Sequence, residues 1–156
     1  MSGVVPHSRL EADVLIREMV PSDAQRAAEL SGELGYPASA DEIRQRLHEL
    51  QQASHAVYAA CLDGVVVGWI EVGIAHHLQS GACGEIGGLI VSASRQGRGI
   101  GRQLVETAER WVASRGITTL VVRSRITRAA AHDFYLGLNF ERLKTSAVFK
   151  KSIELR

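Results

Sequence analysis

One stretch of the chain, residues 85–102, limits most narrowly the folds that the sequence can adopt. Glu85–Ser92 is an apolar run that predicts a buried strand, and the residues from Gly99 repeat at helical spacing as far as Gly116. Between these segments Gln96–Gly101 forms a glycine-rich turn, and glycine lets backbone N–H groups approach an anion closely. The N-terminal end of the following helix adds a partial positive charge. The stretch therefore predicts a phosphate-binding turn, with three arginines suited to phosphate oxygens: Arg95, Arg98 and Arg102.

Composition places the chain among globular proteins of ordinary size. Its 156 residues are 46% hydrophobic and 22% charged, so we expect residues 12–156 to form a single domain after a flexible tail, residues 1–11. The formal net charge of +1 argues against a nucleic-acid partner. Cys61 and Cys83 lack the spacing of metal ligands, so no metal is expected and both thiols are predicted to be reduced. Because no membrane span or signal-peptide core is recognisable, the sequence predicts a cytoplasmic protein without a membrane partner.

Hydrophobic periodicity predicts a mixed order of strands and helices, an α/β (α+β) fold. The dipeptide Asp63-Gly64 predicts a two-residue hairpin, whereas residues 76–84 are expected to form a polar connection. Ser39 and Glu42 have the spacing of a capping box at a helix start. The expected helices begin near Pro21, Ser39, Gly99 and Ala129. The expected strands are Val14–Val20, Ala56–Leu62, Val65–Ala75, Glu85–Ser92 and Thr118–Ser124, with a closing hairpin of residues 141–144 and 147–155.

Two other classes of phosphate-binding loop do not match these residues. A Walker-type loop ends in Gly-Lys-Ser/Thr, but Gly101 is followed by Arg102-Gln103. A dinucleotide fingerprint needs glycine or alanine at the place that Arg102 occupies.

The turn Gln96-Gly97-Arg98-Gly99-Ile100-Gly101 resembles the Gln/Arg-x-x-Gly-x-Gly/Ala signature of the GNAT superfamily of acyl-CoA-dependent N-acetyltransferases. Downstream, Arg128–Phe140 resembles the second helical motif of that family, with Arg128 in place of a common asparagine and Asn139 in place of the usual glycine. Asparagine tolerates the left-handed conformation, so the turn at Asn139 can be kept. The resemblance runs from about Val14 to Leu155 and implies a single domain with a mixed central sheet of about six to seven strands flanked by about four helices.

The resemblance implies transfer of an acetyl group from acetyl-CoA, the co-substrate, to a primary amine by direct attack in a ternary complex. An alkyl amine has a pKa of about 10.4, so a base must remove its proton. We expect this base to be Glu85, predicted at the start of the central strand, with Glu71 as the alternative. His76 and His77, expected in a loop, are weaker candidates.

Further roles follow from the resemblance alone. Tyr135 is expected to protonate the departing thiolate, and the backbone N–H of Leu89 to stabilise the oxyanion. The strand that contains Val91 is expected to hold the pantetheine arm, and the glycine-rich turn the pyrophosphate. The expected cofactor-binding residues are Leu89, Ile90, Val91, Gln96, Gly97, Arg98, Gly99, Ile100, Gly101, Arg102 and Arg128.

The acceptor pocket implied by the resemblance is lined by Tyr36, Trp69 and Glu71, with Phe149 from the closing hairpin. Such a lining favours a cationic amine: an aminoglycoside, a polyamine, an amino acid or a lysine side chain of a peptide. A non-catalytic acyl-CoA-binding regulatory module is the alternative function. The apolar segment Ala147–Phe149 is a candidate for pairing across a homodimer.

Overall fold

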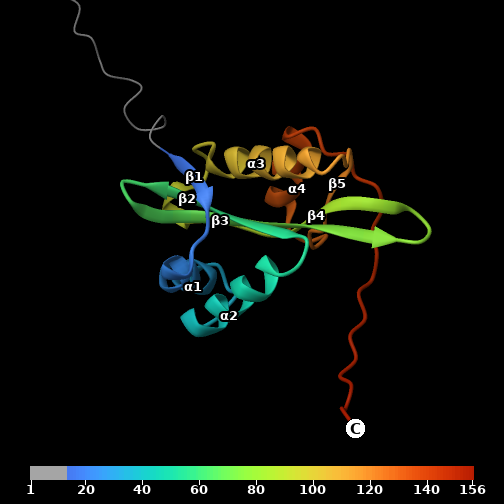
Figure 1. Cartoon of the computed structure of the whole chain (residues 1–156). Coiled ribbons are helices and arrows are strands. Elements are labelled where there is room, and N and C mark those ends of the chain that lie inside the picture. The colour runs from blue at the N-terminus through green and yellow to red at the C-terminus, as the bar shows by residue number, and fades with distance from the viewer. Residues whose placement is uncertain (1–13) are drawn as a thin grey trace, which may run out of the picture. The chain divides into compact units, whose positions relative to one another are not determined.

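The computed structural model describes residues 14–156, which belong to two compact units (Figure 1). One unit runs to Arg123 and the other from Ser124 to Arg156, and each is described by itself. The predicted tail, residues 1–11, lies outside the described residues. The expectation of one domain over residues 12–156 stays a prediction.

The first unit is built on a mixed five-stranded sheet with the strand order β1-β2-β3-β4-β5. Neighbouring strands from β1 to β4 are antiparallel, and β5 is parallel to β4, which confirms the predicted mixed sheet. Asp63 and Gly64 both have positive φ, 51° and 77°, as the predicted two-residue hairpin between β2 and β3 requires. The strands are β1 (Leu15–Glu18), β2 (His55–Leu62), β3 (Val65–His77), β4 (Gly81–Val91) and β5 (Leu120–Val122).

Helices cover both faces of this sheet: α1 (Ala24–Glu33) and α2 (Ala40–Gln51) lie on one face and α3 (Ile100–Ser114) on the other (Figure 1). The predicted capping box starts α2, because the Glu42 amide donates to Ser39 Oγ at 3.0 Å and the Ser39 amide to Glu42 Oε1 at 3.1 Å. Among the described residues, no helix is long and apolar enough to cross a membrane.

The hydrophobic core of the first unit has a part on each face of the sheet. Toward α1 and α2 it contains Leu30, Leu47 and Ile90, each at most 6% exposed. Toward α3 it contains four residues of the helical series that the sequence predicts, Ile100, Leu104, Ala108 and Val112, together with Val105, whereas Trp111 of that series is only half-buried. Full burial of side chains of this size contributes about 1.5–3 kcal/mol each, so this packing fixes α3 and the turn before it on the sheet.

The second unit contains one helix, α4 (Ala129–Gly137), close to the predicted range. The closing hairpin predicted over residues 141–155 is wrong, since residues 138–156 contain neither helix nor strand and the tail side chains are exposed. The predicted count of six to seven strands is therefore also wrong for the described chain, which has five. Alternating apolar residues give a segment β-propensity, but a strand forms only where an edge is available for pairing.

Two boundaries near the centre of the sheet also differ from the prediction. The segment expected as a polar connection shortens to a turn, because β3 continues through His77 and β4 already begins at Gly81. His76 and His77 therefore lie on β3 rather than in a loop, and Glu85 lies in the middle of β4 rather than at its start. Hydrogen bonds between the two backbones extend these strands, whereas the polar side chains of residues 76–84 are typical of a loop. The side chains therefore did not indicate that the strands continue.

Gly84 lets α3 pack closely on β4, and its replacement tests this contact. A Cβ at Gly84 would lie 2.5 Å from Cγ2 of Val112, so we expect Gly84→Ala to lower the free energy of unfolding by about 1–3 kcal/mol. The control is Gly32→Ala in α1, where a Cβ meets nothing within 4 Å and should stabilise the helix by about 0.5–1 kcal/mol. Urea denaturation measures both, and equal stabilities of the two variants would contradict the contact.

Candidate active site

A bulge between β3 and β4 shapes the centre of the sheet. Glu71 pairs with Gly88 and Val72 with Ile86, so Gly87 is an extra residue on β4. A Cβ at Gly87 would overlap the Glu71 carboxylate, and a Cβ at Gly88 would lie 2.9 Å from the Trp69 ring. The two glycines therefore make the space in which these β3 side chains lie across β4.

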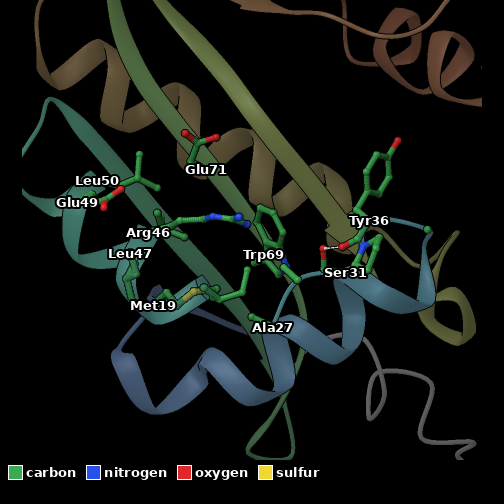
Figure 2. Close-up of a pocket in the computed structure, with 15 residues that line it drawn as sticks. Met19, Ala27, Ser31, Tyr36, Arg46, Leu47, Glu49, Leu50, Trp69 and Glu71 are labelled. Carbon is green, nitrogen blue, oxygen red and sulfur yellow. Dashed lines mark hydrogen bonds between the residues drawn. The ribbon is translucent and has the colours of Figure 1, made fainter. Parts of the chain in front are cut away.

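A cavity of about 720 Å³ opens beside this bulge, between the helices α1 and α2 and the sheet (Figure 2). It brings together three residues that the sequence predicted for an acceptor pocket, Tyr36, Trp69 and Glu71. The fourth, Phe149, belongs to the second unit, where its side chain is 92% exposed. The remaining lining residues are Met19, Ala27, Ser31, Gly35, Pro37, Ala38, Ile43, Arg46, Leu47, Glu49, Leu50 and Val57.

The loop that carries Tyr36 is held by the end of α1. The Ser31 hydroxyl donates to the Tyr36 carbonyl, and the Tyr36 amide donates to the Ser31 carbonyl at 2.8 Å. Gly35 has a φ of +87°, which allows the sharp turn that ends the helix. These contacts fix the backbone at the rim of the cavity.

Glu71 is the carboxylate that the sheet contributes to the cavity lining. Its side chain is 21% exposed, and burial raises its pKa, because a buried carboxylate loses hydration. The His55 imidazole counteracts this increase in pKa, and Glu85 adds to it. His55 Nδ1 lies 3.3 Å from Glu71 Oε1. The Glu71 carboxyl therefore holds a proton more readily than the carboxyl of an exposed glutamate does.

Glu85, the expected base, lies on β4 but is not among the residues that line the cavity. It forms an ion pair with Arg123, which follows β5. The two histidines of the sequence analysis, His76 and His77, are exposed and pair with Ala82 and Gly81 near the turn of the hairpin. The structure thus brings Glu71 to the cavity and gives Glu85 a cationic partner.

The last residues of β4 have an unpaired edge. β5 pairs with β4 only at Gly84–Ile86. The Ser92 amide donates to the Val67 carbonyl of β3 at 2.8 Å, and because amide directions alternate along a strand, the amides of Leu89 and Val91 point to the opposite edge. Among the described strands none pairs with that edge, so these amides are available to a ligand. The side chain of Ile90 is 6% exposed and belongs to the core.

The glycine-rich turn leads from this edge into α3. Gly97 and Gly99 have φ values of +77° and +81°, in the left-handed region that glycine favours. Gly99 caps α3 without a side-chain hydrogen bond, and the first amides of a helix have no partner inside it. Gln96 Nε2 donates to the Val91 carbonyl at 3.2 Å and ties the turn to β4. In the described part of the chain, no carboxylate forms an ion pair with the arginines here: Arg95, Arg98 and Arg102.

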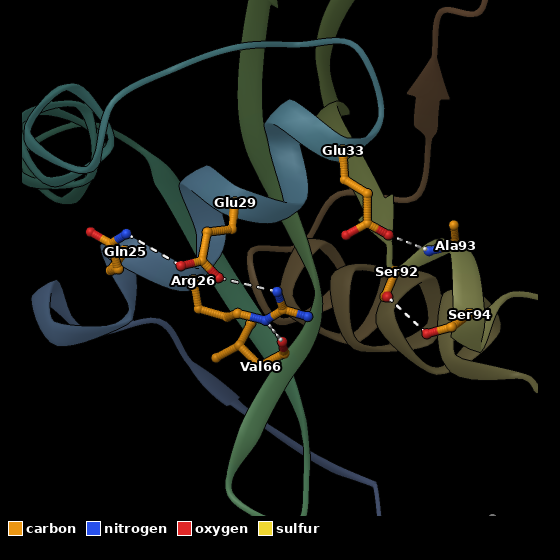
Figure 3. A network of polar contacts seen from close by, with 8 residues as sticks. All are labelled: Gln25, Arg26, Glu29, Glu33, Val66, Ser92, Ala93 and Ser94. Carbon is orange, nitrogen blue, oxygen red and sulfur yellow. Dashed lines mark hydrogen bonds and ion pairs between the residues drawn. The ribbon is translucent and has the colours of Figure 1, made fainter.

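Side chains of α1 connect the cavity wall with the approach to this turn (Figure 3). Arg26 Nε donates to the Val66 carbonyl at 3.0 Å, and Glu33 Oε1 accepts from the Ala93 amide at 3.2 Å. Ser92 and Ser94 also form a hydrogen bond, at 3.3 Å. One helix therefore positions both the cavity and the segment after β4, and no local sequence pattern signalled these long-range contacts.

In the second unit, aromatic rings surround Tyr135. The Phe134 and Phe140 ring centroids lie 5.2 and 5.5 Å from that of Tyr135, edge to face. Burial raises the pKa of the Tyr135 phenol, so the group stays a neutral proton donor at pH 7. Arg128 is the residue before α4, and Asn139 has the positive φ, 68°, that the sequence analysis allowed for.

Comparison with known proteins matches these motifs to one family. The Acetyltransferase (GNAT) family matches residues 23–140, which include all but one of the residues that line the cavity, the unpaired edge of β4, the glycine-rich turn and α4. The chain belongs to this family. It is therefore an acyltransferase that moves an acetyl group from acetyl-CoA, its co-substrate, to an amine.

The relatives of this GNAT enzyme include aminoglycoside N(6')-acetyltransferases. One from Stenotrophomonas maltophilia is 31% identical over 89% of this chain and 94% of its own length, and one from Salmonella typhimurium is 25% identical over 66% and 74%. Among solved structures, AAC(6')-Iy with a CoA-based bisubstrate analogue has a TM-score of 0.79 at 22% identity, covering 90% of this chain and 99% of that one. AAC(6')-Ih from Acinetobacter baumannii has a TM-score of 0.78 at 21% identity, with the same coverages. The structural likeness confirms the GNAT fold.

No sequence pattern pointed to His55, the imidazole that lies beside Glu71. It stands at the start of β2, where a single histidine carries no recognisable motif. Only the pairing of β2 with β3 brings it opposite Gly73 and next to Glu71.

The raised pKa of Glu71 predicts a pH-dependent effect of Glu71→Gln on stability. A carboxyl whose pKa is raised on folding contributes stability below its unfolded pKa, about 4.3, and loses it as the pH rises through the folded value. We therefore expect Glu71→Gln to raise Tm relative to the native protein more at about pH 8 than at about pH 4. The control is Glu49→Gln at an exposed position of α2, and a Glu71→Gln effect independent of pH would contradict the assignment.

Proposed function

We propose that the acceptor of this enzyme is a primary amine of an aminoglycoside. The observation that carries the proposal is the cavity beside the bulge, where the Glu71 carboxylate and the Trp69 ring lie in the same lining. A carboxylate attracts a protonated amine, and an aromatic ring offers a face to the C–H groups of a sugar and to a cation. The aminoglycoside N(6')-acetyltransferases to which this chain is similar support the same class of acceptor.

In the proposed reaction Glu71, acting directly or through one water, takes a proton from the acceptor ammonium. The free amine attacks the thioester carbonyl, a C–N bond forms, and the negative charge moves to the carbonyl oxygen. The Leu89 N–H stabilises that oxygen, since its amide is directed to the unpaired edge of β4. The carbonyl re-forms as the C–S bond breaks, and Tyr135 donates its phenol proton to the departing thiolate of CoA. The second proton on the new C–N nitrogen is lost to solvent, from which the Tyr135 phenolate is reprotonated, and the neutral amide remains.

The cofactor is proposed to bind along the same edge. The amide of Val91 pairs with the pantetheine arm, while Leu89 and Ile90 contribute backbone to the same strand. The turn Gln96–Arg102 receives the pyrophosphate through its backbone amides and through arginine side chains, and Arg128 adds a cation. Gln96 holds the turn against Val91, so its side chain acts on the shape of the turn.

Of the two candidate bases, Glu71 is supported better than Glu85. Glu71 lines the cavity and has a raised pKa, which brings a carboxylate closer to the working pH of a general base. Glu85 does not line the cavity, and its carboxylate is engaged in an ion pair with Arg123. We propose that Glu85 contributes negative charge beside the site rather than taking the proton.

Parallel measurements on Glu71→Gln and Glu85→Gln test this assignment. Because general base catalysis contributes about 100- to 10,000-fold, we expect kcat to fall by at least about 100-fold in Glu71→Gln and by less than about tenfold in Glu85→Gln. Steady-state kinetics of CoA release with an aminoglycoside acceptor provides the measurement. The reverse order of the two effects would return the base to Glu85.

The role of Tyr135 predicts that Tyr135→Phe slows the chemical step. Removal of the phenol proton should lower kcat by about 100-fold or more while the Kd of CoA changes little. Phe140→Leu, which changes an aromatic neighbour of Tyr135 but keeps the phenol, is the matched control. Turnover of Tyr135→Phe equal to that of the native enzyme would remove Tyr135 from the mechanism.

The walls of the cavity favour a second acceptor class, a monoamine with an apolar body. Most lining residues are apolar, among them Met19, Ile43 and Val57, and the charged residues are Glu71, Glu49 and Arg46. An acetylation screen that compares aminoglycosides with arylalkylamines and linear polyamines decides between the classes. The proposal predicts the highest kcat/KM for aminoglycosides, and a higher value for an arylalkylamine would replace it.

Five expectations from the sequence remain proposals. A homodimer through Ala147–Phe149 is supported by the exposure of this segment, with Val148 87% exposed, and a monomer by light scattering would contradict it. Acceptance of a peptide amine is tested in the same screen with a lysine peptide. The absence of a nucleic-acid partner is proposed from the net charge of +1. The absence of a membrane partner and a cytoplasmic location are proposed because the sequence has no recognisable membrane span or signal-peptide core.

A further inference from the structure

His55 and Glu71 form a polar pair that spans two strands of the sheet. His55 is the first residue of β2 and pairs with Gly73 of β3, two residues beyond Glu71. This diagonal arrangement places the two side chains on the same face, within reach of each other. His55 Nδ1 lies 3.3 Å from Glu71 Oε1.

The pair occupies space that two glycines provide. A Cβ at Gly73 would overlap the His55 ring, and a Cβ at Gly87 would overlap the Glu71 carboxylate. Any other residue at either position would push one member of the pair away. The sheet therefore has room for the imidazole and for the carboxylate only in this arrangement of β2, β3 and β4.

His55 Nδ1 is buried and has no aligned hydrogen-bond partner among the described residues, so Glu71 is the polar group that it faces. The other charged group close to Glu71 is Glu85 of β4, which pairs with Arg123. Two carboxylates close together repel each other, and a donor on the far side of Glu71 counteracts this repulsion. The imidazole is placed to be that donor.

We propose that His55 is a positioning residue: its Nδ1–H faces the Glu71 carboxylate and holds it across Gly87, directed into the acceptor cavity. This inference rests on the proposed role of Glu71 at the acceptor. His55 itself does not line the cavity and takes no proton from the substrate. Its contribution is to restrict the rotamers of Glu71, because a base displaced by about 1 Å from its productive position loses about 100-fold in rate.

Kinetics of two His55 variants test the positioning role. We expect His55→Leu to lower kcat/KM for the amine about 10- to 100-fold while KM for acetyl-CoA stays within about twofold. His55→Asn, whose side-chain amide can donate from nearly the same place as Nδ1, should recover most of that loss. His48→Leu on the exposed surface of α2 is the control. Equal losses in His55→Leu and His55→Asn, or an equal rise in KM for acetyl-CoA, would overturn the proposal.

A second measurement needs no acceptor, so its result is independent of the proposed function. In long-range ¹H–¹⁵N spectra of the full chain at a pH where the imidazole is neutral, the native protein should show His55 protonated at Nδ1. In Glu71→Gln the preference should move toward the Nε2–H tautomer, because the carboxylate that selects Nδ1–H is gone. An unchanged tautomer would refute the pairing, whereas the predicted change together with no aminoglycoside turnover would refute only the acceptor.

Discussion

The pairing of β3 with β4 is the interaction on which the other parts of the site depend. Its bulge at Gly87 turns two consecutive glycines toward one face of the sheet, and the side chains of Trp69 and Glu71 fill the space. In a regular strand, consecutive residues point to opposite faces of the sheet. Here both glycines point to the same face, and a side chain at either one would collide with Glu71 or Trp69. The shape of the cavity floor therefore follows from backbone register rather than from the side chains of β4.

The two edges of β4 have different partners. On one side it is hydrogen-bonded to β3 along its whole length, which holds the cavity residues in register. On the other side β5 leaves it after Ile86, so that backbone amides near Leu89 and Val91 have no strand partner. One rigid strand thus separates a face suited to a cationic acceptor from an edge suited to the cofactor.

Helix α1 connects these two regions. It supplies Ala27 and Ser31 to the cavity, and its Glu33 carboxylate accepts the Ala93 amide just after β4. The helix is itself anchored in the core by Leu30, which is fully buried. Because interiors are close-packed, a shift of α1 would alter the cavity and the glycine-rich turn together.

Local sequence patterns determined most of the elements. The capping box at Ser39 and the Asp63-Gly64 hairpin are each coded by a few neighbouring residues, and the helix after Gly99 by an apolar repeat along its length. The structure confirms all three. The family resemblance in the turn and in Arg128–Phe140 led from these elements to an acetyltransferase. The prediction of a closing hairpin was wrong because β-propensity does not specify which strand edge a segment pairs with.

The tertiary structure decided how distant residues meet. The twofold repeat of a strand puts Trp69 and Glu71 on one face, but no local pattern connects them with His55 or with Gly87. Those contacts depend on which strands are neighbours and on a one-residue shift in their register, and neither property is written in a local pattern. The sequence by itself therefore determined the family and the elements, whereas strand pairing decided which carboxylate reaches the cavity and which histidine lies beside it.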